Sequence, residues 1–104
     1  MTDKELLEAA AKAGGFMWWD SDLEVWQGGP DIHTDWDPLV DDGDAFQVAV
    51  KLRIEVLPYE DAVVVRFPLG PDRELHEIRE IMGLDRYETT RRAIVRAAAE
   101  MGRV

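Results

Sequence analysis

The chain has 104 residues, 46% of them apolar, so it can form one domain with one modest core and has no room for a second. It has no cysteine, which excludes a disulfide framework, a thiolate zinc site and a cysteine nucleophile. Its 12 basic and 22 acidic residues give a formal charge of −10, which opposes binding to nucleic acid or to an anionic membrane.

The first third of the chain predicts a helix followed by a hairpin. Thr2 and Glu5 have the spacing of a capping box, and a pair of glycines follows the apolar positions, so a helix is expected over residues 3–13. Residues 16–19 and 23–26 are rich in aromatic and branched side chains and flank a polar turn, which predicts two paired strands.

The middle of the chain predicts a second helix and a second hairpin. Asp41 or Asp42 can cap a helix over residues 42–52. The strand-like runs 54–57 and 62–67 are separated by a turn composition, so they are expected to pair. The buried stripe of the helix is expected to consist of Ala45, Val48, Ala49 and Leu52.

The last third predicts two more helices. Leu75, Ile78 and Met82 share one helical face, which predicts a short helix over residues 72–82. A longer helix is expected over residues 89–101. Its buried face is expected to consist of Ala93, Ile94, Ala97, Ala98 and Met101.

Together these elements predict an α/β fold of the α+β type, with residues 1–104 in one domain. The expected architecture is a three-layer α/β/α sandwich around a small, mostly antiparallel sheet of about four strands. Trp18 and Trp19 should point to opposite faces of a strand, so either helices cover both faces or one ring is exposed for contact. No apolar run reaches the roughly 18 residues of a membrane span, and the start lacks a signal pattern, so a cytoplasmic location is expected.

Negative charge is concentrated between residues 20 and 44, where neither Lys nor Arg occurs. Such a surface attracts a basic partner, and a neighbouring Trp can supply apolar contact area. The candidate partner-binding residues are Asp20, Asp22, Asp31, Asp35, Trp36, Asp37, Asp41 and Asp42.

The acidic run also offers a metal-binding alternative. Asp31, His33, Asp35 and Asp37 alternate along the chain and would suit a divalent cation if the loop folded them inward. The residue order of an EF-hand loop is missing, and acidic loops are most often solvated, so no metal or cofactor is predicted. A metal-assisted enzyme or a nucleotide-binding protein that uses residues 31–37 remains an alternative. The absence of a nucleophile with an adjacent base favours a non-enzyme.

A second alternative is a basic face on the last helix. It consists of Arg91, Arg92 and Arg96, the kind of cluster that can contact phosphates. Glu88 and Glu100 stand four residues from Arg92 and Arg96, which predicts a solvated helix face with local ion pairs. With the net charge, this spacing disfavours DNA or RNA as a partner.

Three stretches of the chain carry a resemblance to a known family: residues 2–14 (TDKELLEAAAKAG), 36–54 (WDPLVDDGDAFQVAVKLRI) and 90–102 (TRRAIVRAAAEMG). Together they resemble the phage ABA-sandwich domain family of small bacteriophage and prophage proteins. The resemblance implies the sandwich fold, a phage or prophage origin, and hence the cytoplasm of a bacterial host cell. It implies no particular reaction or ligand.

The sequence therefore predicts a non-enzymatic phage accessory protein that binds a host or phage protein with a basic surface. One form of this hypothesis is an acidic inhibitor of a host defence or nucleic-acid-handling factor, because carboxylates can occupy positions where phosphates would lie. A structural homo-oligomer is the other class considered.

Overall fold

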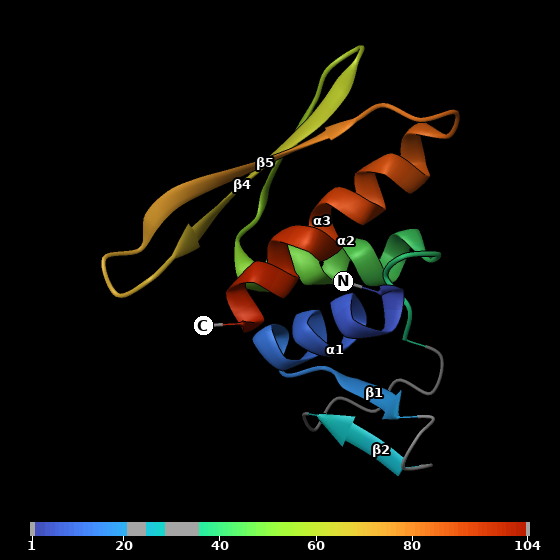
Figure 1. Cartoon of the computed structure of the whole chain (residues 1–104), viewed down its shortest axis with the longest axis vertical. Coiled ribbons are helices and arrows are strands. Elements are labelled where there is room, and N and C mark those ends of the chain that lie inside the picture. The colour runs from blue at the N-terminus through green and yellow to red at the C-terminus, as the bar shows by residue number, and fades with distance from the viewer. Residues whose placement is uncertain (1, 21–24, 29–35, 104) are drawn as a thin grey trace.

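A three-stranded antiparallel sheet packed on helices organises the chain in this computed structural model (Figure 1). The structure describes residues 2–20, 25–28 and 36–103. Along the chain the elements are α1 (Asp3–Gly14), β1 (Met17–Asp20), β2 (Val25–Gly28), α2 (Asp42–Leu52), β3 (Glu55–Pro58), β4 (Ala62–Leu69), β5 (Glu74–Ile81) and α3 (Arg86–Gly102). The predicted mixture of helices and antiparallel strands is confirmed. In this part of the chain no helix is both long enough and apolar enough to cross a membrane.

The first two helices begin where the sequence predicts, because their caps are built locally. The Thr2 hydroxyl accepts a hydrogen bond from the Glu5 amide at 3.2 Å, and the Glu5 carboxylate accepts one from the Thr2 amide. These bonds with Thr2 lower the pKa of Glu5. Helix α1 ends at Gly14 and is followed by the C-cap residue Gly15, whose φ of 70° is the left-handed conformation that glycine favours. In α2 the Asp41 carboxylate accepts from the Asp44 amide at 2.8 Å.

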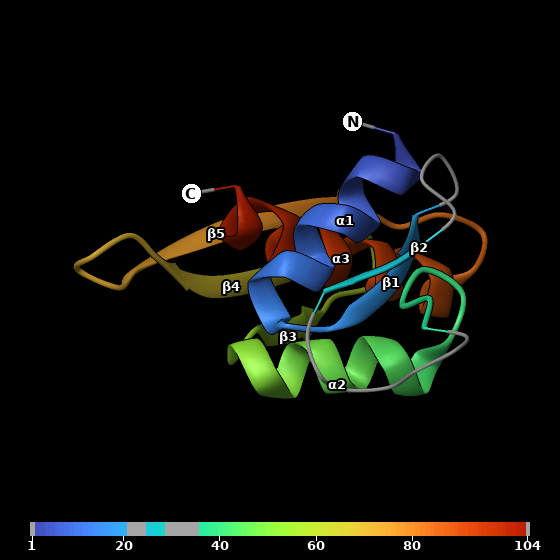
Figure 2. The ribbon, with the colours of Figure 1, turned by 90° about the horizontal axis from the view of Figure 1, so that it is seen from below.

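Helix α3 lies at the centre of the fold, between the sheet and α1, and α2 also packs against it (Figures 1 and 2). Because neighbours cover it on several sides, its buried positions extend beyond the single predicted face. They are Thr89, Ala93, Ile94, Val95, Ala97, Ala98 and Ala99. The predicted core positions Val48 and Ile94 are confirmed, at 0% and 6% exposure.

Strand β4 is the central strand of the sheet and pairs antiparallel with both β3 and β5. Val63, Val65 and Phe67 point toward the helices and are buried in the core. On the opposite face, Leu75 and Ile81 of β5 are 65% and 70% exposed. The predicted hairpin of β3 and β4 is confirmed. On this second face the side chains of β5 are open to solvent, whereas Ala62 and Val64 of β4 are buried.

The predicted single four-stranded sheet is wrong. Strands β1 and β2 pair with each other as predicted, but they form a separate two-stranded sheet beside α1 (Figure 1). The physical reason is the position of α1: it lies on the far side of α3 from the larger sheet, and β1 follows it almost directly. Helices α3 and α1 are therefore stacked on one side of the larger sheet, in place of a helix on each face of a shared sheet.

The predicted helix over residues 72–82 is also wrong, because residues Glu74–Ile81 form strand β5. Every residue of β5 is paired with a residue of β4, from Glu74 opposite Leu69 to Ile81 opposite Ala62. A helix here would leave the backbone groups on that side of the buried strand β4 without hydrogen-bond partners. The free-energy cost of those unpaired groups is larger than the gain from the helical propensity of this segment.

Candidate binding groove between α2, β3 and α3

An apolar groove of about 630 Å³ lies between α2, β3 and the first half of α3. Small core residues form its base, since Ala45 and Ala49 are buried. The lining comprises Asp42, Ala45, Phe46, Ala49 and Val50 from α2, then Ile54, Val56 and Pro58, and Tyr87, Thr90, Arg91 and Ile94 from α3.

Three large apolar side chains at this groove are open to solvent. Phe46 and Val50 are 68% and 61% exposed and stand one turn apart on α2. Tyr87, in the first turn of α3, is 70% exposed on the other side of the groove. A cluster of exposed apolar side chains around a hollow is typical of a surface that binds another molecule.

Sequence reasoning missed this groove. It assigned the apolar positions of α2 to one buried stripe and left Phe46 and Val50 without a role. The available signal was their position, because an apolar residue outside the core-facing stripe of a short helix has no internal neighbour. The contribution of Tyr87 could not be found in this way, since it comes from a distant segment.

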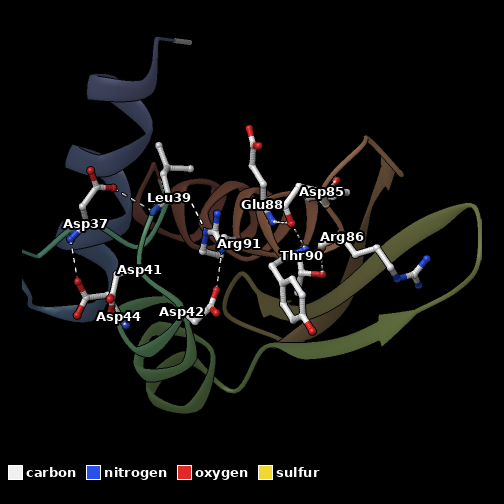
Figure 3. Close-up of polar contacts among 12 residues, drawn as sticks. Asp37, Leu39, Asp41, Asp42, Asp44, Asp85, Arg86, Glu88, Thr90 and Arg91 are labelled. Carbon is white, nitrogen blue, oxygen red and sulfur yellow. Dashed lines mark hydrogen bonds and ion pairs between the residues drawn. The ribbon is translucent and has the colours of Figure 1, made fainter.

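Arg91 joins the two helical walls of the groove (Figure 3). Its Nε donates to the Leu39 carbonyl at 2.9 Å, and a terminal nitrogen donates to the Asp42 carboxylate at 2.7 Å. The Arg91 side chain is only 15% exposed. The bonds tie α3 to the start of α2, so they help to set the separation of the groove walls.

Three aspartates of the predicted acidic surface are engaged at the start of α2 (Figure 3). Asp41 caps the helix, and Asp42 pairs with Arg91. Asp37 accepts from the Leu39 amide at 3.0 Å, while its own amide donates to the Asp44 carboxylate at 2.9 Å. These carboxylates form a connected network, and Asp41 and Asp42 retain exposed surface beside the groove.

The start of α3 is held by a second network (Figure 3). Asp85 accepts from the amides of Tyr87 and Glu88 at 2.9 and 3.3 Å. Arg86 donates to the carbonyls of Tyr59 and Glu60 in the turn between β3 and β4, at 2.7 and 3.2 Å. The backbone that carries Tyr87 is therefore fixed against the hairpin that borders the groove.

Trp36, a predicted contact residue, lies in the core. It is 7% exposed and its ring is stacked on Phe16 with the centroids 5.3 Å apart. Its Nε1 has no hydrogen-bond partner among the described residues.

The predicted contact residues Asp22, Asp31 and Asp35 lie outside the described residues, as do His33 of the metal alternative and the side chains of Asp20, Trp18 and Trp19. Among the residues that the structure describes, no group of His, Asp and Glu is arranged to hold a metal ion.

The expected ion pairs of the basic face are replaced by pairs to other elements. Arg92 bonds Asp3 of α1 at 3.0 Å, and Arg96 bonds Glu80 of β5. Arg91, expected on a solvated face, is mostly buried and pairs with Asp42. The three arginines therefore hold α3 to its neighbours, and each has a carboxylate partner.

Comparison with known proteins gives no relative: no family model, curated protein or solved structure matches this chain.

Proposed function

We propose that this protein is a non-enzymatic binding protein and that the apolar groove between α2, β3 and α3 is its contact surface. The observation that carries the proposal is the exposure of Phe46, Val50 and Tyr87 around one hollow of about 630 Å³. Burying a large apolar side chain on binding contributes about 1.5–3 kcal/mol, so three of them suffice as a binding centre.

The occupant of the groove is a protein segment with apolar side chains flanked by basic residues. The groove supplies the apolar complement, and Asp41, Asp42 and Asp85 place exposed carboxylates at the ends of α2 and α3 that border it. The overall charge of −10 accelerates the approach of such a partner and slows that of an acidic one.

The resemblance to phage accessory proteins suggests the source of the partner, a host or phage protein in the cytoplasm of a bacterial host. Inhibition of a host defence or nucleic-acid-handling factor is one consequence of this activity, since a basic surface that contacts nucleic acid would suit the acidic rim of the groove. In this proposal the apolar contacts in the groove slow dissociation of the complex, and the carboxylates speed its association.

A synthetic peptide tests the proposal directly. The probe is a cationic amphipathic helical peptide, compared with a peptide of the same apolar pattern that carries Glu in place of Lys, and binding is followed by fluorescence anisotropy. We expect the cationic peptide to bind more tightly than the acidic one. Phe46→Ser with Val50→Ser should weaken its binding by roughly tenfold or more, because each lost contact of about 1.4 kcal/mol corresponds to a factor of ten.

Val40→Ser is the matched control, since Val40 is 69% exposed but does not line the groove. It should leave peptide affinity unchanged. Equal affinity of the wild-type protein and the Phe46→Ser, Val50→Ser variant, with strong dependence on salt, would show that carboxylates alone bind the peptide and would contradict the groove as the contact surface.

A further inference from the structure

Strand β5 has an unpaired edge. It pairs with β4 on one side, and among the described strands none pairs with its other side. The β4–β5 hairpin projects beyond the helices, and most residues of β5 are exposed (Figures 1 and 2). A strand of eight residues with a free edge is a template for pairing with another chain.

The register of the sheet shows which residues offer free backbone groups. Beyond the last pair, the Met82 amide donates to the Asp61 carbonyl at 2.9 Å, so even-numbered positions of β5 face β4 in the alternating antiparallel pattern. The free edge therefore presents the amides and carbonyls of Leu75, Glu77, Arg79 and Ile81. Their side chains are exposed on the face of the sheet that points away from the core, because the residues between them oppose buried core positions of β4.

The sequence of this edge is complementary to itself about Ile78. When two copies of β5 are placed antiparallel with a two-fold axis at Ile78, Glu77 stands opposite the partner's Arg79, and Leu75 stands opposite the partner's Ile81. We infer that the protein forms a homodimer in which two β5 strands pair antiparallel about Ile78, giving one continuous six-stranded sheet. This inference concerns a surface separate from the groove.

The inner face of the same arrangement is also compatible. Ile78, which packs partly buried against the core, meets the partner's Ile78 at the axis. His76, whose ring lies 6.1 Å from that of Phe67, stands opposite the partner's Glu80. Apolar residues therefore meet apolar residues on this face, and the imidazole meets a carboxylate.

Other symmetric registers are disfavoured by charge. An axis at Glu77 or at Arg79 places like charges directly opposite each other, which is destabilising. An axis at residue 76 or 80 places the charged Glu77 or Arg79 against an apolar side chain. The charges on this edge thus block general pairing, as in many natural sheets, while they permit one register.

Ion pairs within the chain extend this complementarity. Arg66 donates to Glu77 at 2.7 Å, and this hydrogen bond raises the pKa of Arg66. Arg79 contacts Asp61 at 3.3 Å. In the dimer these pairs join into rows of alternating sign, from Asp61 through Arg79 to the partner's Glu77 and Arg66.

Reversal of single charges tests the dimer. Sedimentation equilibrium of the wild-type chain should show a mass of twice 11.8 kDa as concentration rises. Glu77→Arg and Arg79→Glu should each be monomeric, because each homodimer would oppose like charges. An equimolar mixture of the two variants should recover the dimer, since every contact at the axis is then between Arg and Glu.

Recovery on mixing separates an interface from a folding defect, because a misfolded variant gains nothing from a second variant. A wild-type chain that stays at 11.8 kDa up to millimolar concentration would overturn the inference. Variants that dimerise alone, or a mixture that stays monomeric, would do the same.

The register is tested by cross-linking. The chain has no cysteine, so Ile78→Cys introduces one thiol, which the two-fold axis places beside its copy at a separation suited to a disulfide. Oxidised Ile78→Cys should migrate as a covalent dimer, whereas His76→Cys should not. The opposite result would overturn the pairing about Ile78.

Discussion

At Gly102 the absence of a side chain sets how closely helices α1 and α3 approach. A Cβ atom at Gly102 would lie 1.9 Å from the Ala9 carbonyl oxygen and 2.8 Å from the Ala9 carbonyl carbon. Backbone atoms cannot move aside as a flexible side chain can, so the last turn of α3 fits against α1 only with glycine there. The extensive contact between α1 and α3 depends on this position.

Gly102→Ala should therefore destabilise the protein by about 1–3 kcal/mol, because the added methyl group forces the two helices apart. Urea unfolding followed by circular dichroism measures the change. Glu100→Ala, in the same turn of α3, is the control and should change stability by about 0.5 kcal/mol or less. If both substitutions have equally small effects, the two helices are not in the close contact described.

Burial along a helix could be predicted at the level of single residues, whereas polar partners could not. Val48 and Ile94 each stand at helical spacing from other apolar residues of their own helix, which places them on a buried face without knowledge of the fold. The partners of Arg91 are Leu39 and Asp42, which lie about 50 residues away in sequence. No local pattern indicates such a pair, so the sequence predicted no partner for Arg91 and only the local pairs of Arg92 with Glu88 and of Arg96 with Glu100.

Strand β5 shows the same limit for a whole element. Leu75, Ile78 and Met82 fit one face of a helix. Residues 75, 77, 79 and 81 also stand two apart, as residues on one face of a strand do. Glu, Arg and Leu favour helices, and the apolar spacing fits one. The pairing with β4 along the whole length of β5 makes this segment a strand. That pairing depends on β4, so the residues of β5 alone do not indicate it. The starts of α1 and α2 could be predicted, because each capping residue lies within three positions of the amide that it binds.

Glu80 and Arg96 connect β5 to α3, so they test how this strand is held. Their side chains are 20% and 43% exposed, which leaves the pair partly shielded from water. A double-mutant cycle with Glu80→Gln and Arg96→Ala should give a coupling of about 0.5–1 kcal/mol.

The exposed pair of Glu100 and Arg103 is the matched control for this cycle, at 45% and 55% exposure. Its coupling should be smaller, because both charges lie in solvent and stand in the same turn. A coupling for Glu80 and Arg96 no larger than that of the control would mean that packing alone holds β5 against α3.

For the whole molecule, the distribution of charge matters as much as its sum. Arg91, Arg92 and Arg96 of α3 form ion pairs with α2, α1 and β5, so much of the positive charge is used between elements. The excess of acidic residues is left to repel over longer distances. The net charge follows directly from the sequence, because it is a sum over residues. Which carboxylate each arginine pairs with depends on the fold.

Moderate salt should therefore stabilise the protein. Raising NaCl from 0.01 to 0.15 M shortens the Debye length from about 30 to about 8 Å, which screens the long-range repulsion among carboxylates more than the contacts of the ion pairs. If the gain is about 1 kcal/mol, the melting temperature should rise by about 4–8 °C in calorimetry at dilute, monomeric concentration. Near the isoelectric point of about 4.5 the net charge vanishes, so the same addition of salt should have little effect there. A melting temperature that falls with salt at pH 7 would mean that the ion pairs between α3 and its neighbours outweigh the repulsion of the whole chain.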